Sequence, residues 1–289
     1  MLFRSTVFLR STSGEHRGNA RGRYGRIELR ALRLATGEDL LPAAVREPTV
    51  RDDRSELRVP LPRAVAPGEE ITLALAWRAV LPEIFARTGF RGSFHLVAQW
   101  FPKVAVLEAD GRWARFPFHG HSEFYADFGR YDVTVTVPAG WVVGATGTAD
   151  PVERTAQGER HRFTAWPVHD FAFAAWDRFR ERRGEADGVA VRVLFPPGYD
   201  DAAEVTLATL ARALPGYAQC FGSYPYPGLT VVLPPSEAEG AGGMEYPTLI
   251  TTAAMPLWVP GATAALEHVT LHEFMHQYFY GLEIGRAHV

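Results

Sequence analysis

Cysteine and lysine are almost absent from this 289-residue sequence, in which Cys220 is the single cysteine and Lys103 the single lysine. One cysteine excludes an intrachain disulfide framework and any cysteine-based metal site, and we expect Cys220 to be buried and inert. The net charge is only −3, from 30 basic and 33 acidic residues. Such a balance provides no overall field that would favour nucleic acid or an anionic membrane, so no nucleic-acid partner is expected.

Long apolar runs are also missing. None approaches the roughly 18 residues that a membrane helix needs, so no transmembrane segment is predicted in this chain. The first 17 residues lack a continuous apolar stretch and a small-residue cleavage site, and no signal peptide is predicted. Cytoplasm and periplasm both stay open. The composition, 47% hydrophobic and 22% charged, is that of a globular protein with room for about two domains.

The first part of the chain has the period of strands. Residues 71–77 and 131–137 alternate apolar and polar side chains, and Gly- and Pro-containing turns separate such runs. Since no helical periodicity precedes residue 200, we predict an antiparallel β saddle or sandwich domain over residues 1–185.

The second part alternates strands and helices, which gives an α+β class overall. The charged segment 177–188 is interpreted as a boundary, and a second domain is predicted over 186–282. Its helices are predicted over 202–214, ended by Pro215–Gly216, and over 263–280, with Thr263 as a possible N-cap. Its strands are predicted over 189–195, 229–233 and 249–252.

The chemistry is concentrated in a His-Glu-x-x-His pattern formed by His272, Glu273 and His276. Residues four apart share one helix face, so the two imidazoles can bind one zinc ion at ~2.0–2.1 Å. Glu273 lies about a quarter of a turn away, where it can act as a general base toward an attacking water without being a ligand. The alternative is a helix that carries two solvated or core-packed histidines.

A third zinc ligand is harder to find. The metzincin pattern requires Gly at position 279 and His at 282, where this sequence has Phe279 and Leu282. The only later carboxylate, Glu283, would lie about 10.5 Å further along a continuous helix. His268, one turn before His272, is interpreted as a supporting or core histidine, with ligation as the alternative. No complete site is visible in this chain.

Two motifs together resemble those of a known family. The stretch 272–279, His-Glu-Phe-Met-His-Gln-Tyr-Phe, resembles the zinc helix of the gluzincin aminopeptidases of the aminopeptidase N type. The stretch 242–246, Gly-Gly-Met-Glu-Tyr, resembles the Gly-x-Met-Glu-Asn exopeptidase motif of that family, and 221–227 resembles the Phe-Gly-x-x-Tyr-Pro segment before it. Taken by themselves, the Gly-Gly turn and Glu245 are typical of a plain surface turn.

The resemblance implies a β-saddle domain followed by the first part of a thermolysin-like catalytic domain. It implies Zn²⁺ bound by His272 and His276, Glu273 as the general base, and a peptide substrate with a free N-terminus. It also implies three substrate contacts. Glu245 would hold the α-amine, and Gly242 with Gly243 would line the substrate carbonyl. Gln99 would contact the pocket of the first side chain.

The sequence also departs from the family pattern. Tyr246 replaces the usual Asn, and the third ligand of the family, a Glu, would fall at position 295. We therefore expect a fragment that lacks the first saddle strands and the third ligand and is inactive by itself, with 283–289 as a sequencing-adapter remnant. The alternatives are a zinc endopeptidase or other gluzincin hydrolase in which Glu245 is structural, and a non-catalytic relative that binds other proteins.

Overall fold

A computed structural model describes residues 2–4, 25–46, 56–84, 86–114, 125–253 and 256–280. The remnant predicted at 283–289, including Glu283, lies outside these residues. The chain divides into two compact units. One takes its described residues from Met1–Pro82 and Gln99–Asp127, and the other takes them from Glu83–Ala98 and Phe128–Gly285.

The described part of the first unit is built mainly of antiparallel strands. The strands β2 (Arg26–Leu34) and β4 (Leu73–Val80) pair with a register shift between Leu29 and Ala31. A second sheet has the order β3-β1-β7, formed by Glu56–Arg58, Leu2–Arg4 and Lys103–Val104. A 3-10 turn at Leu41–Ala43 follows β2. Leu32, Leu40 and Val59 form the buried core of this unit.

Two four-stranded antiparallel sheets belong to the second unit. One has the order β5-β6-β13-β9, formed by Gly89–Arg91, Phe94–Val97, Phe173–Trp176 and Val142–Ala145. The other is built around β12, which pairs with the three strands β8, β10 and β11. Their bounds are Gly158–Val168, Gly129–Val137, Thr148–Ala149 and Glu153–Thr155.

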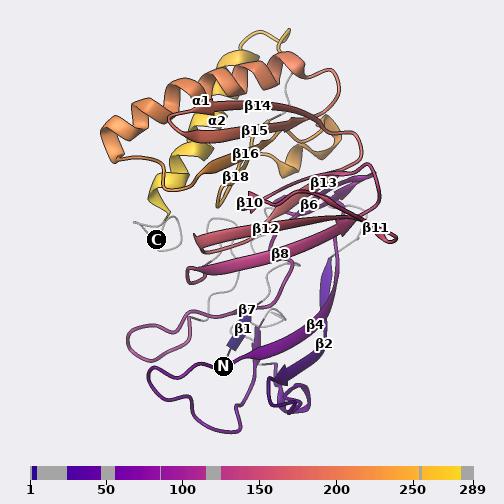
Figure 1. Cartoon of the computed structure of the whole chain (residues 1–289), viewed down its shortest axis with the longest axis vertical. Helices are drawn as coiled ribbons and strands as arrows, with labels where there is room; N and C mark the ends of the chain where they lie inside the picture. Colours follow the sequence, from indigo (N-terminus) through magenta and orange to yellow (C-terminus); the bar gives the residue numbers. More distant parts are fainter. Residues whose placement is uncertain are drawn as a thin grey trace. The chain divides into compact units, whose positions relative to one another are not determined.

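A five-stranded mixed sheet positions the candidate site. Its order is β14-β15-β16-β18-β17, with β15, β16 and β18 parallel and the two outer strands antiparallel. The strands are Arg180–Ala186, Val189–Phe195, Gly228–Val232, Leu249–Thr251 and Met244–Tyr246. Two helices, α1 (Asp200–Phe221) and α2 (Ala262–Phe279), pack together beside this sheet (Figure 1). A 3-10 segment, Ser236–Ala241, precedes β17.

Strand alternation divides the core of this unit between the two faces of the mixed sheet. Val191 and Val193 of β15 lie in a buried cluster with Leu210 of α1 and Phe274 of α2. Leu194, one residue further, lies in the other cluster with the residues of β6 and β13. The period-two pattern therefore buries both faces, one under helices and one under a second sheet.

Helix α1 extends beyond its predicted end. We predicted that Pro215–Gly216 stops it, and that prediction is wrong, because the helix continues to Phe221 with Pro215 inside. Tyr217 stacks on Phe274 of α2, with ring centroids 5.5 Å apart and planes within 6°. Aromatic packing against α2 therefore outweighs the hydrogen bond that a proline cannot donate.

The start of α2 is also different from the prediction. Thr263 is inside the helix, and Gly261 occupies the N-cap with φ of 81° and no side-chain cap. Because glycine adopts this left-handed conformation at little cost, the Pro260–Gly261 turn sets the helix start.

The charged segment 177–188 is largely a strand, because it contains β14, which pairs with β15 along its whole length. The mixed sheet thus crosses positions 185 and 186, where we predicted the domain boundary. The expectation for Cys220 is wrong, since this free cysteine is exposed. None of the described helices is both long and apolar enough to cross a membrane.

Candidate functional site

The two motif histidines lie side by side on α2. Their Nε2 atoms are 3.2 Å apart, and their rings are 4.8 Å apart with planes nearly perpendicular. His272 is exposed and His276 is half-buried, so the pair faces outward from the helix toward solvent. The buried residues of α2, among them Leu266, Thr270 and Phe274, form the neighbouring face. The spacing of four on a helix therefore produces the predicted pair.

This geometry fits zinc. Two ligand atoms of a tetrahedral ion at ~2.0–2.1 Å are about 3.3–3.4 Å apart, close to the Nε2 separation observed. His276 Nδ1 faces Glu245 Oε1 at 3.9 Å, which is too long for a hydrogen bond but places negative charge beside the pair. Zinc prefers imidazole nitrogens as ligands. A carboxylate close to such ligands supplies negative charge that favours the bound cation.

Glu273 is buried below the histidine pair. Only 5% of its surface is exposed, and a Cβ added to Gly243 would lie 3.7 Å from its Oε1 atom. The carboxylate therefore lies against the backbone of the Gly-Gly loop, as expected for a residue rotated away from both histidines.

Glu245 completes a second grouping of possible metal ligands. One atom each from Glu245, Glu273 and His276 lie within 4.8 Å of one another. A single zinc ion needs ligand atoms about 3.3–3.4 Å apart, a criterion that the His272–His276 pair meets more closely. The strand β17 brings Glu245 beside the helix, although it lies 27 positions before His272 in the sequence.

The glycines before Glu245 are required by their surroundings. A Cβ on Gly242 would be 2.5 Å from Thr252 O, and Gly243 has φ of +69°. Their N–H groups donate to Glu239 O and Thr251 O, both at 2.9 Å. The absence of side chains therefore lets another molecule approach the backbone of the loop closely. Both glycine N–H groups already donate hydrogen bonds within the protein.

Gln99 is the one predicted site residue outside the second unit. It is buried, with φ of 54°, and its Oε1 accepts a hydrogen bond from Lys103 Nζ at 2.7 Å. Its predicted contact with the first side-chain pocket stays a prediction.

The sequence analysis missed two residues that hold the loop. Arg87 Nη1 donates to Gly243 O at 2.9 Å, and the Arg87 carbonyl accepts from the Tyr246 hydroxyl at 2.6 Å. Gln277 hydrogen-bonds the backbone of β17 and the following turn. Gln277 was visible as the residue after His276, whereas no local pattern marks Arg87, which lies 156 residues from Gly243.

Tyr280 lies at the end of α2 beside Gln277. Its hydroxyl donates to Gln277 Oε1 at 3.4 Å. Burial raises the pKa of the Tyr280 phenol well above its usual range, so the phenol stays a neutral donor.

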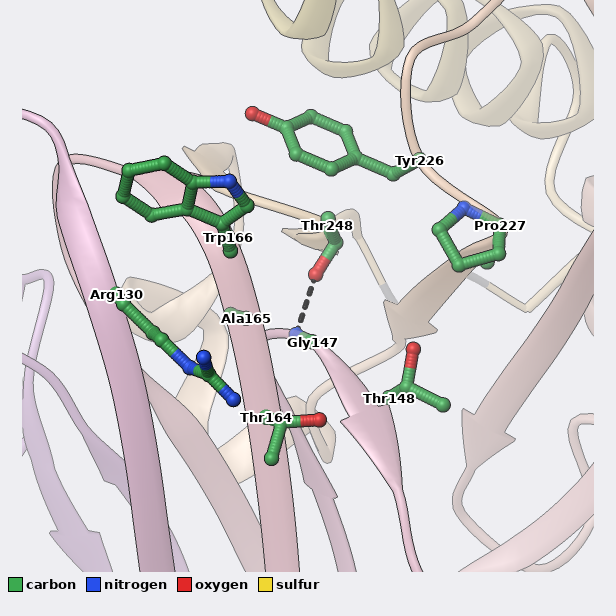
Figure 2. A pocket seen from close by; sticks show the side chains of 10 residues that line it. Arg130, Gly147, Thr148, Thr164, Ala165, Trp166, Tyr226, Pro227 and Thr248 are labelled. Carbon is green, nitrogen blue, oxygen red and sulfur yellow. Dashed lines mark hydrogen bonds between the residues drawn. The ribbon is translucent and has the colours of Figure 1, made fainter.

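A separate hollow of about 580 Å³ lies in the same unit (Figure 2). Arg130, the exposed Trp166, Tyr226 and Thr248 line it, and none of the predicted site residues does. This hollow is therefore separate from the site on α2, which is recognised by its side-chain chemistry.

Comparison with known proteins connects this geometry to solved structures. No family model and no curated protein matches the sequence. An M1 zinc metallopeptidase from Deinococcus radiodurans is similar in structure, with a TM-score of 0.61 and 22% identity. The match covers 88% of this chain and 54% of that one. One mutant structure of that protein contains a Tyr-Ser-Ala substrate.

Two further solved structures are similar in fold to this chain. A two-domain M1 zinc metallopeptidase mutant bound to L-tryptophan has a TM-score of 0.62 and 19% identity, over 96% of this chain and 56% of that one. Legionella pneumophila aminopeptidase A in complex with aspartic acid has a TM-score of 0.63 and 13% identity, over 96% of this chain and 30% of that one.

This chain thus spans about half the length of the M1 zinc metallopeptidases that it matches. The predicted α+β class, with antiparallel sheets before the mixed sheet, is confirmed, and so is the resemblance to gluzincin aminopeptidases at the level of fold. Over the part of those proteins that it covers, the chain has the fold of the M1 zinc metallopeptidases.

Proposed function

We propose that this chain carries part of the active site of a zinc aminopeptidase that removes N-terminal residues from peptides. The observation that carries the proposal is the His272–His276 pair, with Nε2 atoms 3.2 Å apart, beside the buried Glu273. Such a pair with a carboxylate one residue after the first histidine is the arrangement of a zinc peptidase.

Each residue of the site has a separate role in the proposed peptide hydrolysis. Zinc, when bound by His272 and His276, supplies Lewis acidity toward the substrate carbonyl. Glu273 accepts a proton from the attacking water and donates it to the leaving amine. Its burial against Gly243 limits its movement and its access to bulk water, which favours a base of fixed orientation.

Glu245 gives the proposal its exopeptidase character. Its carboxylate lies 3.9 Å from His276 Nδ1, so a substrate ammonium bound there would place the first peptide bond close to the histidine pair. Gly242 and Gly243 allow the substrate backbone to approach closely.

A third protein ligand is part of the proposal. Catalytic zinc sites use three protein ligands and leave one open position, and we place the third at a glutamate near position 295. We also propose a saddle domain followed by the first part of a catalytic domain, with the mixed sheet, from β14 onward, in the catalytic part. The 289-residue chain alone is then inactive, and activity requires an extended form that supplies this ligand.

Two other functions are compatible with the fold. In a zinc endopeptidase or another gluzincin hydrolase, Glu245 would be structural. In a non-catalytic relative, the same fold would serve protein–protein contact. The close histidine pair favours the zinc peptidases, since a binding protein has no need of it.

Replacing Glu245 by glutamine tests the aminopeptidase assignment. In the extended form, kcat/KM for leucine p-nitroanilide should fall about 10- to 100-fold, because a charge-assisted hydrogen bond to the α-amine is lost. Hydrolysis of N-acetyl-leucine p-nitroanilide should not change. The exposed Glu239 in the same loop provides the control Glu239→Gln. An equal loss on both substrates would favour the endopeptidase with a structural Glu245.

A further inference from the structure

Gln277 connects α2 to the strand that carries Glu245. Its amide nitrogen donates to Tyr246 O at 3.1 Å and to Glu245 O at 3.3 Å, and its Oε1 accepts from Thr248 N at 2.8 Å. The side chain is 3% exposed. Since only the amide oxygen can accept from an N–H group, this network determines the orientation of the amide.

The strand β17 lies at the edge of the mixed sheet, where Arg87 also holds it through the Tyr246 hydroxyl. It is the last strand of the mixed sheet, so β18 is its only paired neighbour there. An edge strand with one neighbour is held less firmly than an internal one. Gln277 supplies hydrogen bonds to β17 and to the turn after it, and therefore compensates for this edge position.

The turn after β17 is held by hydrogen bonds from three parts of the chain. Thr248 has φ of 56°, an unusual conformation for a β-branched residue. Its N–H donates to Gln277 and its hydroxyl accepts from Gly147 N at 2.6 Å, the contact drawn in Figure 2. A residue in this conformation persists only where its surroundings hold it. Gln277 is one of three residues that do so, since the Thr248 carbonyl also accepts from Thr230 N at 2.9 Å.

The position of Gln277 in the sequence gives these contacts a functional meaning. It directly follows His276, and its bonds end on the backbone of Glu245, whose carboxylate is 3.9 Å from that histidine. The residue that would bind zinc and the residue that holds the amine-binding strand are thus consecutive on one helix.

We propose that Gln277 is a positioning residue that fixes the distance between the Glu245 carboxylate and the zinc-binding histidines. This inference rests on the proposed function, because the distance matters only if Glu245 binds the substrate amine. Gln277 then determines how well the enzyme selects a free N-terminus. Misplacement by about 1 Å can cost on the order of 10²-fold in catalysis.

Three variants separate this role from a general contribution to folding. Gln277→Ala removes all of the contacts, whereas Gln277→Glu keeps an oxygen for Thr248 N–H and loses the donors to β17. Thr270→Val is the control, because Thr270 is fully buried on the same helix and its hydroxyl has no hydrogen-bond partner among the described residues.

The first readout is residue-resolved hydrogen exchange on the 289-residue chain without metal. Protection of the Thr248 amide should fall about 5- to 10-fold in Gln277→Ala and should be largely kept in Gln277→Glu. Thr270→Val should match the wild type at Thr248, whatever its melting temperature. Unchanged protection in Gln277→Ala, or an equal loss in Thr270→Val, would overturn the inference.

The second readout is selectivity in the extended form. Gln277→Ala and Gln277→Glu should lower kcat/KM for leucine p-nitroanilide about tenfold or more, mostly through KM, while N-acetyl-leucine p-nitroanilide and zinc stoichiometry stay unchanged. Equal losses on both substrates would contradict a positioning role. If the wild type itself does not prefer the free amine, the proposed function fails, and hydrogen exchange still decides whether Gln277 fixes the strand.

Discussion

Replacing Glu273 by glutamine in the extended form should leave zinc bound and lower kcat by at least about 10²-fold. The carboxylate is buried, lies 3.7 Å from a Cβ position at Gly243 and follows the first histidine of the pair. Glutamine has the same shape but cannot accept the proton of the attacking water, so the zinc ligands stay in place while the base is lost. The measurement is kcat on leucine p-nitroanilide together with metal content.

The matched control is Glu267→Gln, on the same helix. Glu267 forms a surface ion pair with Arg212 at 2.9 Å, and exposed pairs contribute little to stability. Its replacement should leave both zinc content and kcat close to the wild-type values. A Glu273→Gln enzyme with near-normal turnover would show that another group acts as the base.

Replacing His276 by alanine should weaken zinc binding by more than about 100-fold, since even the loss of a residue that supports a ligand costs 10- to 100-fold. His276 is half of the only 3.2 Å imidazole pair that the described residues contain. The zinc dissociation constant of the extended form, measured by competition with a chelator, provides the test.

His268 offers a control with the same chemistry on the same helix. Its ring is 6.3 Å from that of His272, one turn away, and it is exposed. His268→Ala should keep zinc affinity within about twofold of the wild type, because the ring is too distant to share an ion at ~2.0–2.1 Å. Equal losses from His268→Ala and His276→Ala would contradict the assignment of the ligand pair.

The histidine pair and the class of fold could be predicted from the sequence because both depend on short-range periodicity. A spacing of four fixes two side chains on one helix face, and period two marks strands such as β8 and β15. The prediction for β15, residues 189–195, agrees with its observed bounds.

The errors have tertiary causes. α1 continues past Pro215 because Tyr217 and Phe221 pack on aromatic residues of α2, which a local pattern does not include. The charged residues of β14 look like a linker, yet the strand is ordered by pairing with β15. Cys220 is exposed because other residues make the apolar contacts at the end of α1.

The residues that hold the Glu245 strand could not be found from sequence periodicity. Arg87 reaches Gly243 across 156 positions, and Gln277 reaches Glu245 across 32. Such contacts depend on how distant elements are packed, and a buried amide has no sequence signal that separates it from a solvated one.

Anomalous diffraction at the zinc edge, from crystals of the extended form grown with Zn²⁺, would locate the bound ion relative to α2. We expect one strong peak at ~2.0–2.1 Å from Nε2 of both His272 and His276, with Glu273 and Glu245 outside ligand distance. A peak coordinated by Glu245, Glu273 and His276, or one away from α2, would contradict it.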